Sequence, residues 1–346
     1  MLDLCSLTPE ELGQWLVTAG EKSFRAKQIF EWVYEKGAVT WDEMTNVSKE
    51  LREKLSQEFR FPTLERVRCV DSNDGETFKT LWRLSDGMMV ESVLICSGDR
   101  RTVCVSSQVG CPAKCAFCAS GKNGFFRNLS PAEIIEQVLL THNELQKKGE
   151  RVSHIVFMGM GEPMENYDAV VKTIRLLAQP GLLNISQRRI TVSTVGVIEG
   201  IQKLALEEFK VNLVLSLHAP TQQLRKKIIP YARRYDLEDV LKAMDNYTAI
   251  TKRDITYEYT LLAGINDTIE CAELLVQLLR NKQCTVNLIP YNPVDGLNLK
   301  RPAREVIEAF RQILDDARIV NTCRYTKGDD IGAACGQLAL QQIGSV

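Results

Sequence analysis

The feature that most constrains the fold is a strand–loop–helix pattern that repeats from Thr102 onward. Apolar, β-branched segments alternate with helical stretches, which predicts parallel βα units. Right-handed crossovers would close such units into a full or partial barrel, with the chemistry at the C-terminal ends of the strands. The six expected strands span residues 103–107, 154–157, 189–193, 212–217, 256–261 and 285–289.

The first 96 residues have a different pattern. Thr8, Pro9 and Glu11 are typical of a capped helix start, and apolar residues recur at helical spacing to about residue 60. Turn sequences at 71–75 and 85–87 separate β-prone runs. We therefore expect a small α+β N-terminal domain over residues 1–96 and a larger domain over 97–346.

The composition restricts the class of protein. The chain has 346 residues, 45% of them hydrophobic, which is enough for two packed domains. Because it has no bilayer-length apolar run and no secretory signal at its start, we expect a cytoplasmic protein without a membrane segment. Eleven cysteines in a reducing compartment indicate metal or thiol chemistry. The net charge of −1 does not indicate nucleic acid, so any RNA site would depend on local basic patches.

Three cysteines, Cys111, Cys115 and Cys118, follow the first expected strand with the spacing C-x3-C-x2-C. Three thiolates on a four-iron cluster leave one iron without a protein ligand, free to bind the amino and carboxylate groups of S-adenosylmethionine. Electron transfer into the sulfonium would release a 5′-deoxyadenosyl radical. The alternative is a zinc site with a fourth ligand. Structural zinc usually uses two separated cysteine pairs, and this chain has no second pair.

Polar residues end several expected strands, at the edge where a cosubstrate would bind. Glycines at residues 159 and 161 allow close backbone approach, and the adjacent carboxylate could take the ammonium of an amino acid. Each of these residues alone would be read as a loop hydrogen-bonding group. The candidate cosubstrate contacts are Gly161, Glu162, Ser193, Ser216, His218 and Asn292.

Five stretches together resemble the RlmN/Cfr family of radical adenine methyltransferases, the RlmN branch in particular. They are residues 24–29, 104–111, 159–163, 216–220 and 328–338. The resemblance covers essentially the whole chain. It implies an α/β fold, namely a partial (β/α)6 radical S-adenosylmethionine barrel, and it adds Leu217 to the cosubstrate contacts.

The resemblance also implies a route to methylation of carbon 2 of an adenine, which is too electron-poor to attack a sulfonium methyl directly. Cys335, in a C-terminal loop, would accept a methyl group and deliver it to the base through a radical. Glu91 would accept a proton, and Cys104 would release the RNA by forming a transient disulfide with Cys335. Without the resemblance, both cysteines would be small buried hydrophobes and Glu91 a solvated glutamate.

The implied partners are 23S ribosomal RNA, a transfer RNA adenine beside the anticodon, and an electron donor such as flavodoxin or ferredoxin. We expect a monomer whose N-terminal domain contacts RNA. The nearest alternative is the sister activity, methylation of carbon 8 of the same base. Pro163 argues against this alternative, because it resembles the carbon-2 branch. Another enzymatic alternative is a radical enzyme that activates a glycyl-radical partner, but in such an enzyme Cys335 would have no function. The non-enzyme alternative is a zinc-stabilised RNA-binding protein.

Overall fold

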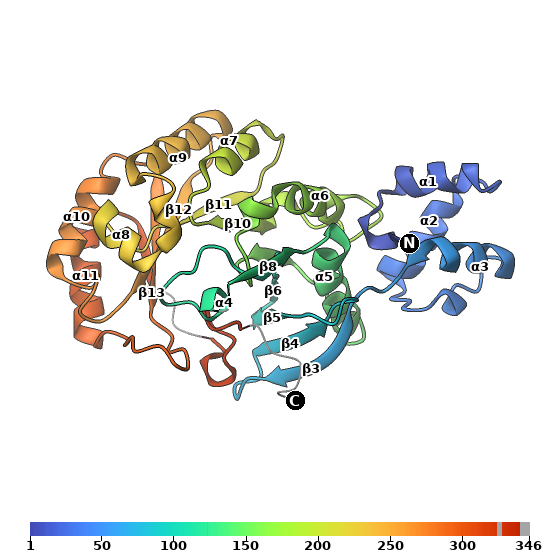
Figure 1. Cartoon of the computed structure of the whole chain (residues 1–346), viewed down its shortest axis with the longest axis horizontal. Coiled ribbons are helices and arrows are strands. Elements are labelled where there is room, and N and C mark those ends of the chain that lie inside the picture. The colour runs from blue at the N-terminus through green and yellow to red at the C-terminus, as the bar shows by residue number, and fades with distance from the viewer. Residues whose placement is uncertain (123, 324–326, 340–346) are drawn as a thin grey trace.

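The computed structural model describes residues 1–122, 124–323 and 327–339. They form a curved ten-stranded sheet with helices on its outside (Figure 1). Its strand order is β14-β13-β12-β11-β10-β9-β6-β5-β4-β3. Strands β6 and β9 to β14 are parallel to one another, whereas β3, β4 and β5 are antiparallel.

The strands of this sheet are short and mostly buried in the parallel half. They are β3 (Glu65–Asp71), β4 (Thr77–Arg83), β5 (Met89–Ser97), β6 (Arg100–Cys104), β9 (His154–Phe157), β10 (Ile190–Thr194), β11 (Asn212–Ser216), β12 (Ile255–Leu261), β13 (Cys284–Pro290) and β14 (Asn321–Cys323). Two further pairs are β1 (Leu2–Asp3) with β2 (Phe59–Arg60), and β7 (Gln108–Gly110) with β8 (Phe125–Asn128).

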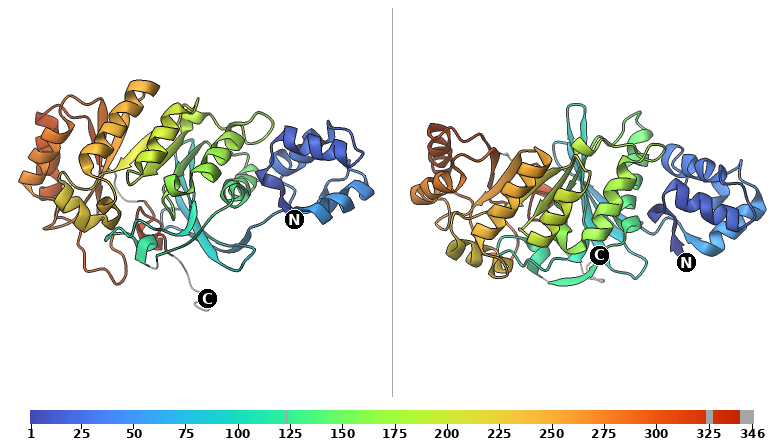
Figure 2. Two further views of the ribbon diagram at one scale, coloured as in Figure 1. Left: turned by 45° about the horizontal axis from the view of Figure 1, so that its top comes forward. Right: turned by 90° about the horizontal axis from the view of Figure 1, so that it is seen from above.

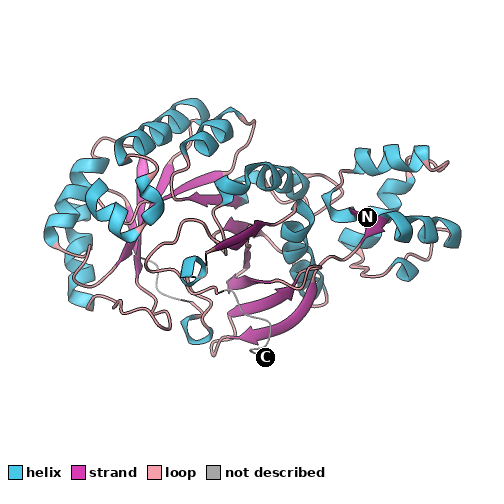
Figure 3. Ribbon diagram, viewed as in Figure 1, coloured by secondary structure: helices cyan, strands magenta, loops and turns pink. Residues whose placement is uncertain are grey.

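Helices alternate with the parallel strands, which confirms the predicted α/β architecture. The described helices are α1 (Pro9–Thr18), α2 (Arg25–Phe30), α3 (Lys49–Glu58), α4 (Ala119–Lys122), α5 (Pro131–Gln146), α6 (Tyr167–Ala178), α7 (Ile198–Leu206), α8 (Gln222–Ile228), α9 (Leu237–Thr251), α10 (Ile269–Leu279) and α11 (Arg304–Asp316). Figure 3 shows most of them outside the curved sheet, while α4 lies on its concave side. None of the described helices is both long enough and apolar enough to span a bilayer.

All six predicted barrel strands are present, at nearly the predicted positions. The first begins and ends three residues early, at Arg100–Cys104, and residues 108–110 form the separate strand β7. The structure adds a seventh parallel strand, β14, paired with β13. The sequence pattern did not indicate this three-residue strand.

The N-terminal helices project from one end of the molecule in all three views (Figures 1 and 2). Helix α1 begins with the predicted cap, in which Thr8 and Glu11 exchange hydrogen bonds with each other's backbone. The antiparallel strands β3 to β5 do not form a separate sheet, because β5 pairs with β6 and so continues into the barrel. The domain boundary at residue 96 therefore lies inside one sheet and stays a prediction.

Candidate functional site

The cysteine loop is held at its base by the small hairpin of β7 and β8. Gly110 has a φ of +74°, and a side chain there would place its Cβ 1.9 Å from the carbonyl oxygen of Gly124. Only glycine fits this close crossing of two backbones. The amide of Cys111 donates to the same carbonyl at 3.0 Å. The hairpin therefore holds the two ends of the cysteine loop in fixed positions.

The three cysteines share one cavity with most of the predicted cosubstrate contacts. Cys111, Cys115 and Cys118 line a cavity of about 120 Å³. The same cavity is lined by residues from the ends of β9, β10 and β11, as the sequence predicted. These are Gly161, Glu162, Ser193, Ser216 and His218. Leu217 is not among the lining residues; it is fully buried, and its backbone joins the neighbouring strand.

Glu162 is a buried carboxylate that organises the wall of this cavity. It accepts hydrogen bonds from the amides of Val195 at 2.8 Å and Met164 at 3.0 Å. Burial raises its pKa to about 7, although these hydrogen bonds act in the opposite direction. Gly159, three residues earlier, packs so closely that a Cβ would lie 2.7 Å from the carbonyl of Val105. The backbone here has no room for a side chain.

Arg225 was not predicted, yet it is the charged side chain most deeply placed in this region. It is fully buried and donates to the carbonyl oxygens of Val195 at 2.6 Å, Ser216 at 3.1 Å and Leu217 at 3.2 Å. Burial lowers its pKa to about 10, so it remains a cation near neutral pH. Its charge favours the thiolate of Cys115, whose pKa is raised by burial and by the other two cysteines.

His218 is neutral in this environment. Its Nδ1 accepts a hydrogen bond from the amide of Thr260 at 2.9 Å, so the ring proton resides on Nε2. Burial and the nearby Arg225 lower its pKa to about 3. The ring packs edge-on against Phe117, with 4.8 Å between centroids. His218 therefore presents a fixed neutral donor, rather than a cation, beside the cysteine loop.

The three thiols fit an iron–sulfur cluster in chemistry and in placement. Among the residues that the structure describes, no three His, Cys, Asp or Glu side chains converge as ligands of one metal ion. A four-iron cluster does not need such convergence, because each thiolate binds a different iron. The buried guanidinium of Arg225 also offsets the negative charge that three thiolates would bring into this interior.

The segment that carries Cys335 is tied to the cysteine loop. The carbonyl of Gly336 accepts from the amide of Ala119 at 2.7 Å, and that of Leu338 accepts from the Ser120 hydroxyl at 2.6 Å. Both donors lie directly after Cys118, in α4. Sequence reasoning did not predict these contacts, which join residues more than 200 positions apart.

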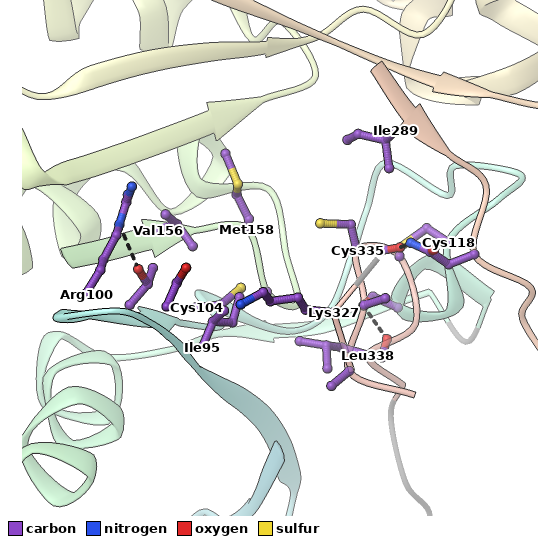
Figure 4. A pocket seen from close by; sticks show the side chains of 18 residues that line it. Ile95, Arg100, Cys104, Cys118, Val156, Met158, Ile289, Lys327, Cys335 and Leu338 are labelled. Atoms are coloured by element: carbon purple, nitrogen blue, oxygen red, sulfur yellow. Dashed lines mark hydrogen bonds between the residues drawn. The ribbon is translucent and has the colours of Figure 1, made fainter. Parts of the chain in front are cut away.

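A second and larger cavity, of about 360 Å³, lies beside the first. It is lined by Cys104 on β6, by Asn292 after β13 and by Cys335 (Figure 4). Cys118, Gly159, Cys335 and others belong to the walls of both cavities. In Figure 4 the Cys335 side chain points into the larger cavity, towards the side where Cys104 lies. No disulfide bond joins the cysteines of the described residues.

Glu91 is not among the residues that line either cavity. Its side chain on β5 is 1% exposed, and Oε2 accepts from the amide of Ala339 at 2.9 Å. The Glu91 carboxylate therefore contacts the segment that carries Cys335, on β5 rather than in the wall of either cavity. Two cations also line the larger cavity. Arg100, on β6, belongs to one of the basic pairs visible in the sequence, whereas Lys327 was not expected from the sequence.

Comparisons with known proteins give a consistent result over the whole chain. Residues 2–60 match the family model "Ribosomal RNA large subunit methyltransferase N-terminal domain", and residues 105–275 match "Radical SAM superfamily". A protein of Protochlamydia amoebophila named "Probable dual-specificity RNA methyltransferase RlmN 2" is 64% identical, with 99% of this chain and 95% of that protein covered. A "Probable dual-specificity RNA methyltransferase RlmN" of Lachnoclostridium phytofermentans is 48% identical, with 97% and 94% covered.

A solved structure also matches from end to end. The crystal structure of a radical SAM methyltransferase from Sphaerobacter thermophilus superposes with a TM-score of 0.96 at 44% sequence identity. The match covers 98% of this chain and 99% of that one. The fold described above, including the small N-terminal helices and the C-terminal segment, is thus shared by the two proteins.

Proposed function

Because the chain belongs to the RlmN family of radical S-adenosylmethionine RNA methyltransferases, we propose that it methylates carbon 2 of an adenine in RNA, with Cys335 as the methyl carrier. The substrates are an adenine of 23S ribosomal RNA and a transfer RNA adenine beside the anticodon. The names of the relatives, dual-specificity RNA methyltransferases, support this choice. The N-terminal match to a ribosomal RNA methyltransferase domain supports RNA contact by the first helices.

Cys111, Cys115 and Cys118 would hold a [4Fe–4S] cluster with one iron left for S-adenosylmethionine. When bound, the cluster and this cosubstrate supply a 5′-deoxyadenosyl radical. The cosubstrate would lie against Gly161, Glu162 and the strand-end residues of the smaller cavity. Ser193, Ser216, Leu217, His218 and Asn292 complete this proposed contact set. An electron donor such as flavodoxin or ferredoxin would reduce the site.

The observation that carries the proposal is the position of Cys335 in the wall shared by both cavities. One cavity contains the cluster cysteines, and the other is large enough to enclose a base. A thioether on Cys335 could thus be activated from one side and meet adenine on the other. Glu91 would accept the proton that leaves carbon 2 of the adduct. Cys104, in the wall of the larger cavity, would then attack the Cys335 sulfur, so that the sulfur–methylene bond breaks, a Cys104–Cys335 disulfide forms and the methylene carbon takes up a proton to become the methyl group.

Reaction with methyl-deuterated S-adenosylmethionine tests this proposal. The Cys335 route removes one hydrogen isotope from the methyl group, so the methylated adenine should retain two of the three deuteriums. Mass spectrometry of the RNA nucleosides measures both the isotope content and the position of the methyl group. Retention of all three deuteriums would contradict the carrier role of Cys335. A carbon-8 product would contradict the proposed regiochemistry in favour of the sister activity.

A further inference from the structure

Lys79 lies on β4, on the side of the strand that faces the C-terminal segment. Its side chain is 13% exposed, and Nζ lies 3.3 Å from Oε1 of Glu91 on the neighbouring strand β5. The same ammonium donates a hydrogen bond to the carbonyl oxygen of Gly332 at 3.1 Å. A lysine that is almost buried and that bonds both a carboxylate and a backbone carbonyl is a fixed structural element rather than a solvated surface charge.

The Lys79–Glu91 ion pair holds the segment that carries Cys335 at two points. Lys79 binds Gly332, three residues before the cysteine, and Glu91 binds the amide of Ala339, four residues after it. On the other side, the middle of the segment is tied to the barrel through the carbonyls of residues 335, 336 and 338. The segment therefore spans the gap between the cluster loop and the antiparallel strands.

The pairing also determines what Glu91 can do. The Glu91 side chain is 1% exposed, and a carboxylate so placed needs a cation or hydrogen-bond donors beside it. A proton acceptor must be ionised before it can act. Lys79 places a positive charge 3.3 Å from this carboxylate, and it is not among the residues that line the cavity where the base would bind.

We propose that Lys79 is a positioning residue: it holds the Glu91 carboxylate in register with the segment carrying Cys335. The proposal rests on the function proposed above, in which Glu91 accepts a proton from the RNA adduct. Lys79 acts only through Glu91 and the segment. Its removal should therefore slow the step after the adduct forms, whereas loading of Cys335 with methyl should continue.

The test compares Lys79→Gln, which removes the charge, with Lys79→Arg, which retains it. Arg83→Gln is a matched control, since Arg83 lies four residues along the same strand and pairs with Glu65 at an exposed position. Four quantities are measured: formation of 5′-deoxyadenosine, methylation of Cys335, turnover of RNA with kcat and KM separated, and the fraction of protein covalently linked to RNA. Thermal melting and visible absorption report folding and cluster content.

We expect Lys79→Gln to lower kcat on the order of 10²-fold with little change in the KM for RNA. The linked protein–RNA fraction should rise, and Lys79→Arg should restore much of the rate. Because Lys79 acts largely through Glu91, the two losses should not multiply: the double variant Lys79→Gln/Glu91→Gln should be only slightly slower than Glu91→Gln alone. This comparison stays informative even if the single variant loses stability, because the double variant removes both charges of the pair.

The outcomes separate this inference from the proposed function. Wild-type protein that forms no methylated Cys335 would contradict both. Normal wild-type chemistry, with Lys79→Gln behaving like Arg83→Gln, would overturn only the role of Lys79. An equal loss in all four quantities, including methylation of Cys335, would show a purely structural lysine and would also overturn it.

Discussion

The side-chain amide of Asn292 donates a hydrogen bond to the backbone carbonyl of Cys335, with 3.1 Å between nitrogen and oxygen. Oδ1 of the same side chain accepts from Nη2 of Arg301 at 3.0 Å, and this guanidinium also contacts Asp329 at 3.2 Å. Asn292 therefore connects the end of β13 with both the cysteine and the turn before it. A residue expected to contact the cosubstrate therefore also fixes the backbone of Cys335, the proposed methyl carrier.

The variant Asn292→Asp separates these two functions of the side chain. The introduced carboxylate would still accept a hydrogen bond from Arg301, but it could not donate to the Cys335 carbonyl. Loss of one such bond costs about 1 kcal/mol, which corresponds to several-fold slower methylation of Cys335. Mass spectrometry of the RNA-free enzyme measures this rate. Asn298→Asp, in the exposed part of the same loop, is the control. Equal rates for both variants would show that the hydrogen bond does not position Cys335.

The cluster cysteines give a prediction about metal content. The triple variant Cys111/Cys115/Cys118→Ala should lose the broad visible absorption of an iron–sulfur protein, and its iron should fall from about four atoms per chain to none. The control triple variant, Cys69/Cys96/Cys323→Ala, removes three thiols outside the cluster loop and should keep its iron. Anaerobically prepared wild-type protein that contained zinc and no iron would instead support the non-enzyme alternative.

Much of the fold could be predicted because its signals are local. The cap at Thr8 involves residues three positions apart and forms as expected, and Ser130 with Glu133 forms the same arrangement at the start of α5. Period and length of the apolar runs indicated the six barrel strands. Strand β14 was missed because Asn321–Cys323 is too short to show a period. The antiparallel strands were expected, but their pairing with β6 depends on non-local contacts that a sequence pattern does not contain.

In the candidate site, too, the features with local signals could be predicted and those that depend on distant contacts could not. Parallel strands end at one edge of a sheet, and this rule predicted that Glu162, Ser193 and Ser216 lie near the cysteines. The structure places these residues and the three cysteines in the wall of one cavity. The buried role of Arg225 could not be predicted, because its acceptors belong to other loops and its neighbours are lysines that suggest a solvated run. The position of Glu91 depends on a hydrogen bond across 248 residues.

Gly159 gives a prediction about the backbone beneath the cosubstrate pocket. A Cβ at this position would lie 2.7 Å from the backbone of Val105, which cannot move without shifting β6 and the strand beside it. Gly159→Ala should therefore lower the free energy of unfolding by about 1–3 kcal/mol and weaken binding of S-adenosylmethionine. Chemical denaturation and calorimetry measure the two effects. Gly13→Ala is the control, since its nearest contact is an ordinary 3.6 Å.

Glu136 on α5 binds the connection between β2 and β3, and it should make stability depend on pH. Its Oε2 accepts from the amide and hydroxyl of Thr63 and from the amide of Leu64, whereas Oε1 is buried without a hydrogen-bond partner among the described residues. Burial raises its pKa from 4.5 to about 7, with Asp3 adding to the rise. Between these values the unfolded chain ionises while the folded protein retains the proton. Stability should therefore fall as the pH rises from 4.5 to about 7 and then become constant.

The variant Glu136→Gln should remove this contribution, because its amide oxygen can still accept from Thr63 and Leu64 while nothing ionises. At about 1.4 kcal/mol per pH unit, it should be more stable than wild type above pH 7 by up to about 3 kcal/mol, with the difference vanishing near pH 4.5. Urea unfolding at a series of pH values measures this. Glu144→Gln, on the partly exposed end of the same helix, should leave the wild-type profile nearly unchanged. If the Glu136→Gln and wild-type profiles run parallel, the buried carboxyl does not retain its proton in the folded protein.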